Sequence, residues 1–158
     1  MNDEILLLSR QIGELLRESG LKLKTAESFT GGAVAAAIVI VAGASEYFDE
    51  GLVCYSAESK TKRLGVKKAN LDAFGAVSLP VLRDMLQGLL ESGADIAVAT
   101  TGNAGPLVQG GAVGECYVGA ANRERVVIKK LLIDAEKGRG EIIQEGVKET
   151  LKAIIDLI

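Results

Sequence analysis

The segment Asp95–Thr101 (DIAVATT) most constrains the fold, because it is an almost unbroken apolar run that leads directly into a glycine-rich loop. A strand of this kind has apolar side chains on both of its faces, as in sheets that helices cover on both sides. The loop from Gly102 to Gly114 follows the carboxyl end of this strand, where open α/β sheets bind their ligands. The segment therefore predicts an α/β fold with a ligand site near its end.

Helix and strand patterns alternate along the rest of the chain. Apolar spacing, capping residues and glycine breaks predict helices at 2–19, 33–41, 58–64, 80–91 and 140–157, and strands at 21–25, 47–55, 95–101, 115–122 and 125–133. Asn2 or Asp3 is expected to cap the first helix, which Gly20 ends, and Ser78 to cap the fourth. This order predicts an α/β fold, a three-layer α/β/α sandwich with a mixed central sheet, as one domain over residues 1–158.

Composition excludes several classes of protein. With 48% hydrophobic and 25% charged residues, the 158-residue chain has the balance of a globular domain and not of a disordered one. A net charge of −3 argues against a nucleic-acid partner. The apolar runs are too short for a transmembrane helix, and the start of the chain is acidic, unlike a signal peptide. We therefore expect no membrane partner and a cytoplasmic location.

The chain contains no histidine, which limits the chemistry open to it. Ser-His-Asp and Cys-His catalysis and histidine-ligated metals are excluded, so a base near neutral pH must be a lysine, tyrosine, cysteine or carboxylate with a shifted pKa. Cys54 and Cys116 lie in separate apolar runs, and two cysteines without further ligands predict neither a zinc site nor a disulfide framework.

The turn Ala26–Gly32 (AESFTGG) joins a predicted strand to a predicted helix and contains the first candidate site residues. Ser28 is placed as a nucleophile can be, and the free N–H groups of the next helix suit an anion or an oxyanion. The alternative is that Ser28 or Thr30 serves only as the helix N-cap. The glycine patterns of P-loops and dinucleotide-binding folds are absent.

Tyr55 and Lys60 form the second candidate group, at the end of a predicted strand and the start of a short helix. Lys60 is a candidate base for Ser28 if burial lowers its pKa, with Tyr55 relaying a proton or holding the lysine. The alternative is that Lys60 belongs to a solvated basic face with neighbouring cations, or to a cluster that attracts an anionic substrate. These neighbours are Lys62, Arg63, Lys67 and Lys68.

The third candidate is the loop that begins Gly102-Asn103-Ala104-Gly105-Pro106 and continues through Gln109-Gly110-Gly111. Backbone N–H groups in such a loop can form a nest for a phosphate or another polar ligand. The alternative is a long surface connection, although loops of this length are usually functional.

Together these motifs resemble one family over nearly the whole chain. The matching segments are A-E-S-x-T-G-G at 26–32, G-A-S-x-x-F at 43–48, G-x-V-x-Y-S at 51–56, L-G-V at 64–66, G-A-V-S at 75–78 and T-G-x-A-G-P at 101–106. The chain is similar to the C-terminal domain of the competence/damage-inducible protein CinA, which also occurs as a stand-alone nicotinamide mononucleotide amidohydrolase. Longer members of the family carry an additional N-terminal domain.

The resemblance implies a function and a set of roles. The reaction is hydrolysis of the carboxamide of nicotinamide mononucleotide, with Ser28 as the nucleophile, Lys60 as its base and Tyr55 assisting. Neither a metal nor a cofactor is required, the partner is a small-molecule nucleotide, and the protein is expected to be a homo-oligomer. An oxyanion hole is expected at Thr30, Gly31 and Gly32, and nucleotide contacts at Gly102, Asn103, Ala104, Gly105, Pro106, Gly110, Gly111 and Arg139.

The chain also departs from the family pattern. Phe29 replaces a cysteine beside the nucleophile, where it is expected to line, block or reshape the pocket, and Asn103 replaces an apolar residue. Residues 107–109 lack the usual acidic residue, Ala112 replaces a proline, and the Gly-Asp-Arg motif is reduced to Gly138-Arg139 without a second arginine. Two alternatives therefore stay open: a catalytically weak or inactive nucleotide-binding or assembly module, and an amidase for another nucleotide-like amide.

Overall fold

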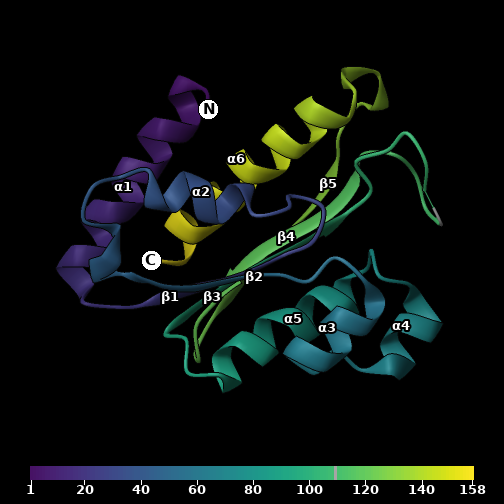
Figure 1. Cartoon of the computed structure of the whole chain (residues 1–158), viewed down its shortest axis with the longest axis horizontal. Helices are drawn as coiled ribbons and strands as arrows, with labels where there is room; N and C mark the ends of the chain where they lie inside the picture. Colours follow the sequence, from purple (N-terminus) through teal and green to yellow (C-terminus); the bar gives the residue numbers. More distant parts are fainter. Residues whose placement is uncertain (109) are drawn as a thin grey trace.

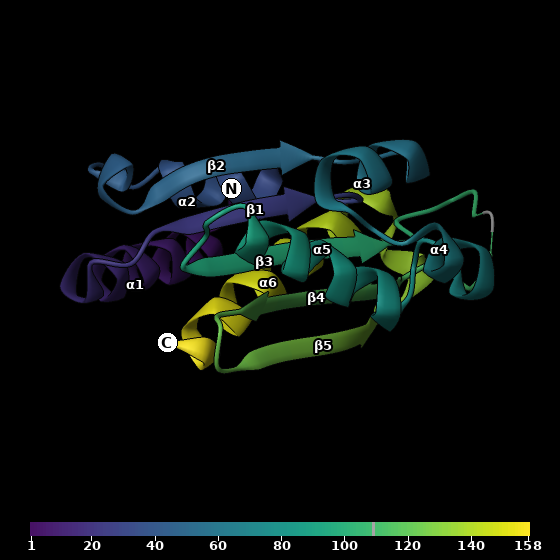
Figure 2. The ribbon, with the colours of Figure 1, turned by 90° about the horizontal axis from the view of Figure 1, so that it is seen from below.

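The centre of the molecule is a five-stranded sheet with the strand order β2-β1-β3-β4-β5, seen across the middle of Figure 2. This is a computed structural model, and it describes residues 1–108 and 110–158. The strands are β1 (Leu23–Glu27), β2 (Phe48–Val53), β3 (Ile96–Gly102), β4 (Glu115–Ala121) and β5 (Val126–Leu132). β1 is parallel to both of its neighbours, whereas β4 is antiparallel to both β3 and β5. The predicted mixed sheet is therefore confirmed.

Helices cover both faces of the sheet. They are α1 (Asp3–Ser19), α2 (Ala33–Val39), α3 (Ala57–Leu64), α4 (Lys68–Phe74), α5 (Leu79–Glu91) and α6 (Arg139–Leu157), with short 3₁₀ turns η1 (Ala44–Glu46) and η2 (Ala135–Lys137). Figure 1 shows α1, α2 and α6 on one side of the sheet and α3, α4 and α5 on the other. The three-layer α/β/α architecture is therefore as predicted.

The predicted caps explain where the long helices begin and end. The Asn2 side chain accepts a hydrogen bond from the Ile5 N–H at 2.9 Å, and Gly20 ends α1 in the left-handed conformation that glycine tolerates. Ser78 accepts from the Val81 N–H at the start of α5, where Pro80 occupies a position that needs no donor. Local sequence therefore sets the ends of both helices.

Two segments differ from the prediction. α4 was not expected, and it contributes no buried residue to the core, which explains why the apolar pattern did not indicate it. β1 begins two residues later than predicted and includes Glu27, which was assigned to the turn. Glu27 is therefore the last residue of a fully buried central strand, directly before Ser28.

The core is built mainly from aliphatic side chains on the two faces of the sheet. One cluster lies under α1, α2 and α6 and includes Ile12, Leu16 and Val98, and another lies under α5 and includes Leu82 and Met85. Both cysteines are buried and free. No helix in the described part of the chain is long and apolar enough to cross a bilayer.

Candidate active site

Ser28 lies at the carboxyl end of β1, where the chain changes direction across the sheet. After β1 the chain passes through α2 on one face to β2, and after β2 it passes through α3, α4 and α5 on the other face to β3 (Figure 1). The connection that leaves β1 leads to β2, whereas the one that leaves the neighbouring parallel strand β3 leads to β4, so the chain turns in opposite directions after these two strands. Such a switch point leaves a crevice outside the strand ends, which is where ligands bind in open α/β sheets.

Lys60 is brought into direct contact with Ser28. Its Nζ lies 2.9 Å from Ser28 Oγ, 2.9 Å from the Cys54 carbonyl oxygen and 3.1 Å from the Tyr55 carbonyl oxygen. Only 1% of the Lys60 surface is exposed, although the residue belongs to a short helix rich in charge. The interpretation of Lys60 as part of a solvated basic face is therefore wrong, while its charged neighbours Lys62 and Arg63 are exposed.

The surroundings of Lys60 favour its neutral form. Burial lowers the pKa of the Lys60 ammonium below its usual value of 10.5, with Cys54 acting weakly in the opposite direction. No carboxylate lies within ion-pair distance of Nζ among the described residues. A neutral amine has two N–H donors and one lone pair. The two carbonyls can therefore accept both donors while the lone pair faces the Ser28 hydroxyl.

The turn after Ser28 is stabilised by a carboxylate, and not by the N-cap that the alternative interpretation expected of Ser28 or Thr30. Gly31 and Gly32 both have positive φ, at 58° and 98°, and Gly32 is the N-cap of α2 without offering a side chain. Glu27 replaces the missing cap by accepting from the N–H groups of Val34 and Ala35 at 2.8 and 3.0 Å. The interpretation of Ser28 or Thr30 as the N-cap is therefore wrong.

The predicted oxyanion hole at Thr30, Gly31 and Gly32 has only some of its backbone N–H groups available to a ligand. The Gly31 N–H is hydrogen-bonded to the Ser28 carbonyl at 3.0 Å, so it is already occupied. The N–H groups of Phe29, Thr30 and Gly32 have no acceptor among residues 1–108 and 110–158. These three N–H groups follow Ser28 in the chain and are available to a developing negative charge.

Tyr55 and Arg139 lie together at the rim of the site. The Tyr55 side chain is 59% exposed, and its hydroxyl accepts from Arg139 Nη2 at 3.0 Å. Arg139 Nη1 donates to the Gly105 carbonyl at 2.6 Å, so the guanidinium connects the Tyr55 side chain to the glycine-rich loop. The phenol is therefore engaged with Arg139, and Tyr55 contacts Lys60 through its backbone carbonyl.

The glycine-rich loop has an inner and an outer part. Gly102 ends β3, Ala104 and Gly105 are buried, and Pro106 is exposed. Farther out, the Asn103 side chain donates from Nδ2 to the Gly110 carbonyl at 2.9 Å, and Gly110 and Gly111 are exposed. Asn103 thus connects the two ends of the outer loop. Gln109, one of the departures from the family pattern, lies outside the described residues.

Phe29 does not lie in the pocket, where its position beside the nucleophile was expected to place it. Its ring is 3% exposed and packs in a third apolar cluster with Ala104, Cys116, Val118 and Ile142. Two glycines make room for it. A Cβ at Gly146 of α6 would lie 2.6 Å from Phe29 Cε2, and one at Gly102 would lie 2.9 Å from Cδ1. The phenyl group is thus a core side chain beneath the site.

Two residues near Ser28 were not assigned a role from the sequence. Glu27 is 1% exposed and contacts Thr30 as well as α2, and Thr100 on β3 contacts both Thr30 and Ser28. The sequence signal for Glu27 is that it is the single charged residue of the segment 26–32 and directly precedes Ser28. No comparable signal distinguishes Thr100 from Thr101, because their neighbours across the sheet decide which hydroxyl faces Ser28.

Grooves elsewhere do not coincide with these residues. One of about 350 Å³ lies at the opposite end of the sheet, lined by Gln87, Leu90, Glu91, Asn122 and Arg123. Within residues 1–108 and 110–158, no three His, Cys, Asp or Glu side chains are grouped as metal ligands would be. Ser28 and Lys60 are a hydroxyl and an amine that the structure brings into direct contact.

Comparison with known proteins places these features in a family. The CinA C-terminal domain family matches residues 6–158. A "CinA-like protein" of Chlorobium limicola is 46% identical over 120 residues, which are 74% of this chain and 28% of that protein. A "putative competence-damage inducible protein" of Clostridium kluyveri is 46% identical over 125 residues, 76% of this chain and 30% of that protein. The chain thus spans about a third of these relatives.

Solved structures agree with this match over almost the full chain. The competence/damage inducible protein CihA of Agrobacterium tumefaciens has a TM-score of 0.94 and 35% identity, with 99% of this chain and 96% of that one covered. A competence damage-inducible protein A of Klebsiella pneumoniae has a TM-score of 0.90 and 30% identity, with coverage of 96% and 95%. The fold, the motifs and these matches together show that the chain belongs to the CinA C-terminal domain family.

Proposed function

We propose that this chain hydrolyses the carboxamide of nicotinamide mononucleotide to nicotinate mononucleotide and ammonia. One observation carries the proposal. A buried lysine, which has no carboxylate partner among the described residues, lies 2.9 Å from a serine hydroxyl at the switch point of an α/β sheet. The chemistry is supported by this pair, and the nicotinamide substrate by the resemblance of the motifs at 26–32, 51–56 and 101–106 to the amidohydrolases of the family.

In the first half of the reaction, neutral Lys60 takes the hydroxyl proton of Ser28 while Oγ forms a bond to the carboxamide carbon. The N–H groups of Phe29, Thr30 and Gly32 are the donors for the resulting oxyanion. When the tetrahedral intermediate collapses, the C–N bond breaks and the Lys60 ammonium returns its proton to the leaving nitrogen, which departs as ammonia. An ester on Ser28 remains.

In the second half, water replaces ammonia in the same geometry. Lys60 removes a proton from the water as its oxygen attacks the ester carbonyl. Collapse breaks the bond to Ser28 Oγ, which takes the proton back from Lys60 and restores the hydroxyl. Nicotinate mononucleotide leaves, and the protein returns to the state with a neutral amine beside Ser28.

The rim residues are suited to hold the mononucleotide. Arg139 carries the positive charge at this edge and contacts Gly105, so a phosphate bound there would compete with the Tyr55 hydroxyl for its guanidinium. Backbone groups of Gly102, Ala104 and Pro106 would contact the sugar and ring, and Gly110 and Gly111 would close the outer side.

The outer loop favours one alternative substrate class. Leu107 is 91% exposed beside Pro106, where the family pattern has polar character, and Asn103 holds the loop to Gly110. An apolar contact there would suit another nucleotide-like amide. The burial of Phe29 removes one reason to propose an inactive binding module, because the ring does not obstruct Ser28.

The test is ammonia release from nicotinamide mononucleotide by wild type and by Ser28→Ala. We expect turnover by wild type and a loss of at least about 10³-fold in Ser28→Ala, since the nucleophile is removed. Ser45→Ala is a matched control, because Ser45 is exposed in η1, which precedes β2 at the end of the sheet opposite to Ser28. Release that persists in Ser28→Ala would overturn the mechanism. Thermal stabilisation by the nucleotide without release would support a binding module.

A further inference from the structure

A chain of hydrogen bonds connects the buried Glu27 carboxylate to the backbone of Ser28. Thr30 Oγ1 lies 2.7 Å from Glu27 Oε1 and 2.8 Å from Thr100 Oγ1. Thr100 Oγ1 in turn accepts from the Ser28 N–H at 3.2 Å, and the same N–H is 3.1 Å from the Thr100 carbonyl. All four residues are buried, so water does not compete with these contacts.

The direction of every hydrogen bond in this chain is fixed by its two ends. A carboxylate only accepts, so the Thr30 hydroxyl must donate to Glu27. Because the Thr30 hydroxyl has only one hydrogen and donates it to Glu27, it must accept from the Thr100 hydroxyl. Thr100 in turn accepts from the Ser28 N–H, which only donates. Each group has a complementary partner, and no second arrangement of the hydroxyl protons satisfies the whole chain.

This arrangement serves more than the stability of α2. The helix start is already held by the contacts of Glu27 with Val34 and Ala35, which need neither hydroxyl. The hydrogen bonds of the two threonines connect the Glu27 carboxylate to β3 and end at Ser28, whose side chain contacts Lys60. Small displacements of a nucleophile reduce the rate strongly, since reacting atoms must lie in near-attack geometry.

We propose that Glu27, Thr30 and Thr100 are positioning residues that hold the backbone of Ser28 so that its hydroxyl faces the Lys60 amine. The proposal rests on the proposed function in one respect, which is the role of Ser28 as nucleophile. It does not depend on the identity of the amide that the protein hydrolyses.

The test measures the reactivity of Ser28 directly with a fluorophosphonate probe. Ser28 Oγ forms a bond to phosphorus, the P–F bond breaks, fluoride leaves, and the hydroxyl proton passes to Lys60. The labelling rate at Ser28, followed by mass spectrometry, is compared for wild type, Thr100→Val and Thr100→Ser. We expect Thr100→Val to label about 10- to 100-fold more slowly. Thr100→Ser, which keeps the hydroxyl, should remain within about threefold of wild type.

Thr25 supplies a matched control in the neighbouring strand. Its hydroxyl is buried and has no hydrogen-bond partner in the described part of the chain, so Thr25→Val removes the same group without breaking a contact. We expect this variant to label at the wild-type rate. With nicotinamide mononucleotide as substrate, Thr100→Val should lower kcat and change KM little, because no group that binds the nucleotide is removed.

A double variant distinguishes a chain from two separate contacts. If Thr30→Val has already broken the chain, adding Thr100→Val should slow labelling little further. Wild-type labelling rates in Thr100→Val, or losses that Thr100→Ser fails to restore, would overturn the positioning role. Rapid Thr100-dependent labelling without any release of ammonia would instead contradict the proposed substrate and leave the positioning role intact.

Discussion

Lys60 and Lys148 have the same side chain in opposite environments. Lys60 is buried beside Ser28, its Nζ contacts a hydroxyl and two carbonyls, and burial lowers its pKa. Lys148 lies at the surface of α6, 2.8 Å from the Glu145 carboxylate, and this hydrogen bond raises its pKa above 10.5. The difference is one of burial and of charged partners: desolvation disfavours the charged form of Lys60, whereas the Glu145 carboxylate stabilises the charged form of Lys148.

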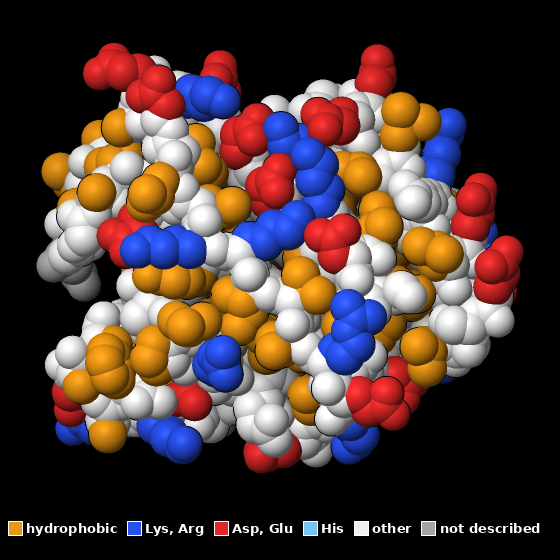
Figure 3. Space-filling view, turned by 180° about the vertical axis from the view of Figure 1, so that it is seen from behind, with side chains coloured by type: hydrophobic (Ala, Val, Ile, Leu, Met, Phe, Trp, Pro, Cys, Tyr) orange, Lys and Arg blue, Asp and Glu red, His pale blue; other side chains and the backbone are white. Residues whose placement is uncertain are grey.

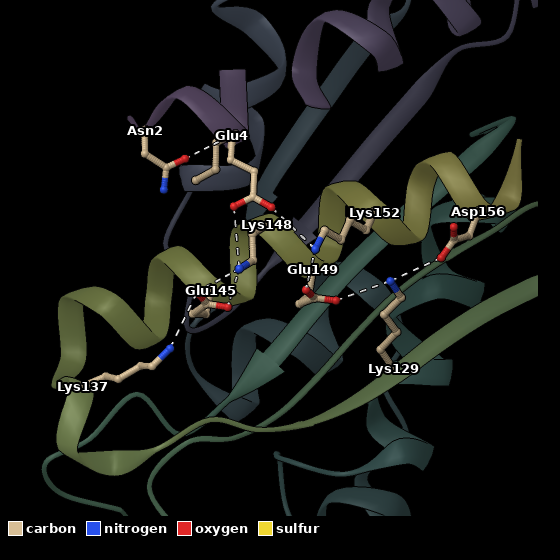
Figure 4. Close-up of polar contacts among 10 residues, drawn as sticks. Asn2, Glu4, Lys129, Lys137, Glu145, Lys148, Glu149, Lys152 and Asp156 are labelled. Carbon is tan, nitrogen blue, oxygen red and sulfur yellow. Dashed lines mark hydrogen bonds and ion pairs between the residues drawn. The ribbon is translucent and has the colours of Figure 1, made fainter. Parts of the chain in front are cut away.

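Lys148 belongs to an extended ion-pair network that connects α1, β5, η2 and α6. Lys148 and Lys152 of α6 both approach Glu4 of α1, at 3.9 and 3.7 Å. On β5, Lys129 contacts Glu149 and Asp156 of α6 at 3.5 and 3.3 Å, as Figure 4 shows. In Figure 3, which views the molecule from behind, basic and acidic side chains lie next to one another near the centre of the view.

The comparison supports the proposal that a chain without histidine uses a lysine with a lowered pKa as its base. Lys148 is unsuited to this role, because its hydrogen bond to the Glu145 carboxylate stabilises the ammonium and raises its pKa. Among the described residues no carboxylate pairs with Lys60, and the buried carboxylate of Glu27 accepts hydrogen bonds from the start of α2 and from Thr30. Because these negative charges are kept away from Lys60, they do not offset the effect of burial on its pKa.

The largest expected effect comes from replacing the buried lysine. Lys60→Arg keeps a positive charge, but a guanidinium is protonated at every accessible pH and cannot take the Ser28 proton. We expect ammonia release to fall by about 10²- to 10⁴-fold, the contribution of a general base. Lys148→Arg is the matched control and should retain wild-type turnover. Equal losses in both variants would show that the two lysines do not differ as the structure indicates.

The pH dependence of kcat/KM should show the lowered pKa of Lys60. Only the neutral amine accepts the Ser28 proton, so kcat/KM should rise with pH and level off once the pH exceeds the pKa of Lys60 in the folded protein. Below that pKa, the rate should fall by about tenfold for each pH unit. The same profile in Lys148→Met should be unchanged. A wild-type rate that keeps rising beyond pH 10.5 would contradict a lowered pKa.

The lowered pKa of Lys60 should also make the free energy of unfolding depend on pH. Between the lowered pKa of folded Lys60 and its unfolded value near 10.5, the unfolded chain binds a proton that the folded chain does not. The free energy of unfolding of wild type relative to Lys60→Met should therefore rise with pH in this window, by at most about 1.4 kcal/mol per pH unit. Denaturant titrations of both proteins from pH 7 to 10 measure it, and a flat difference would contradict the effect of burial.

Much of the fold follows from local sequence, and the site only in part. The apolar run ending at Thr101 and the capping residues Asn2 and Ser78 predict the layers and several helix ends, because these signals are local. Spacing and composition alone favour a solvated basic face for Lys60. Its burial depends on β2 and α3 folding against the end of β1, and the family resemblance supplied that information in advance.

The expectation for Phe29 was wrong for a comparable reason. Its neighbour Ser28 faces the site, which made a pocket position plausible for a bulky side chain. The space for the ring comes from Gly146 on α6 and Gly102 on β3, which are distant in sequence and give no signal in the turn itself. A nonlocal match of one large and two small residues thus decides which side of the turn is core.

The smallest expected effect is the loss of a surface pair. Lys148→Met removes the contacts with Glu145 and Glu4, and since both partners are partly solvated we expect the protein to lose at most about 1 kcal/mol of stability, less at high salt. The Glu145 pKa is lowered, mainly by the hydrogen bond from Lys148, so this contribution is present above the unfolded value near 4.5 and is lost as pH falls through the folded one. Denaturant titrations of wild type and Lys148→Met at low and high salt measure the effect. A loss unaffected by salt would show that Lys148 stabilises α6 by packing, and the contrast with Lys60 would then concern burial alone and not charge.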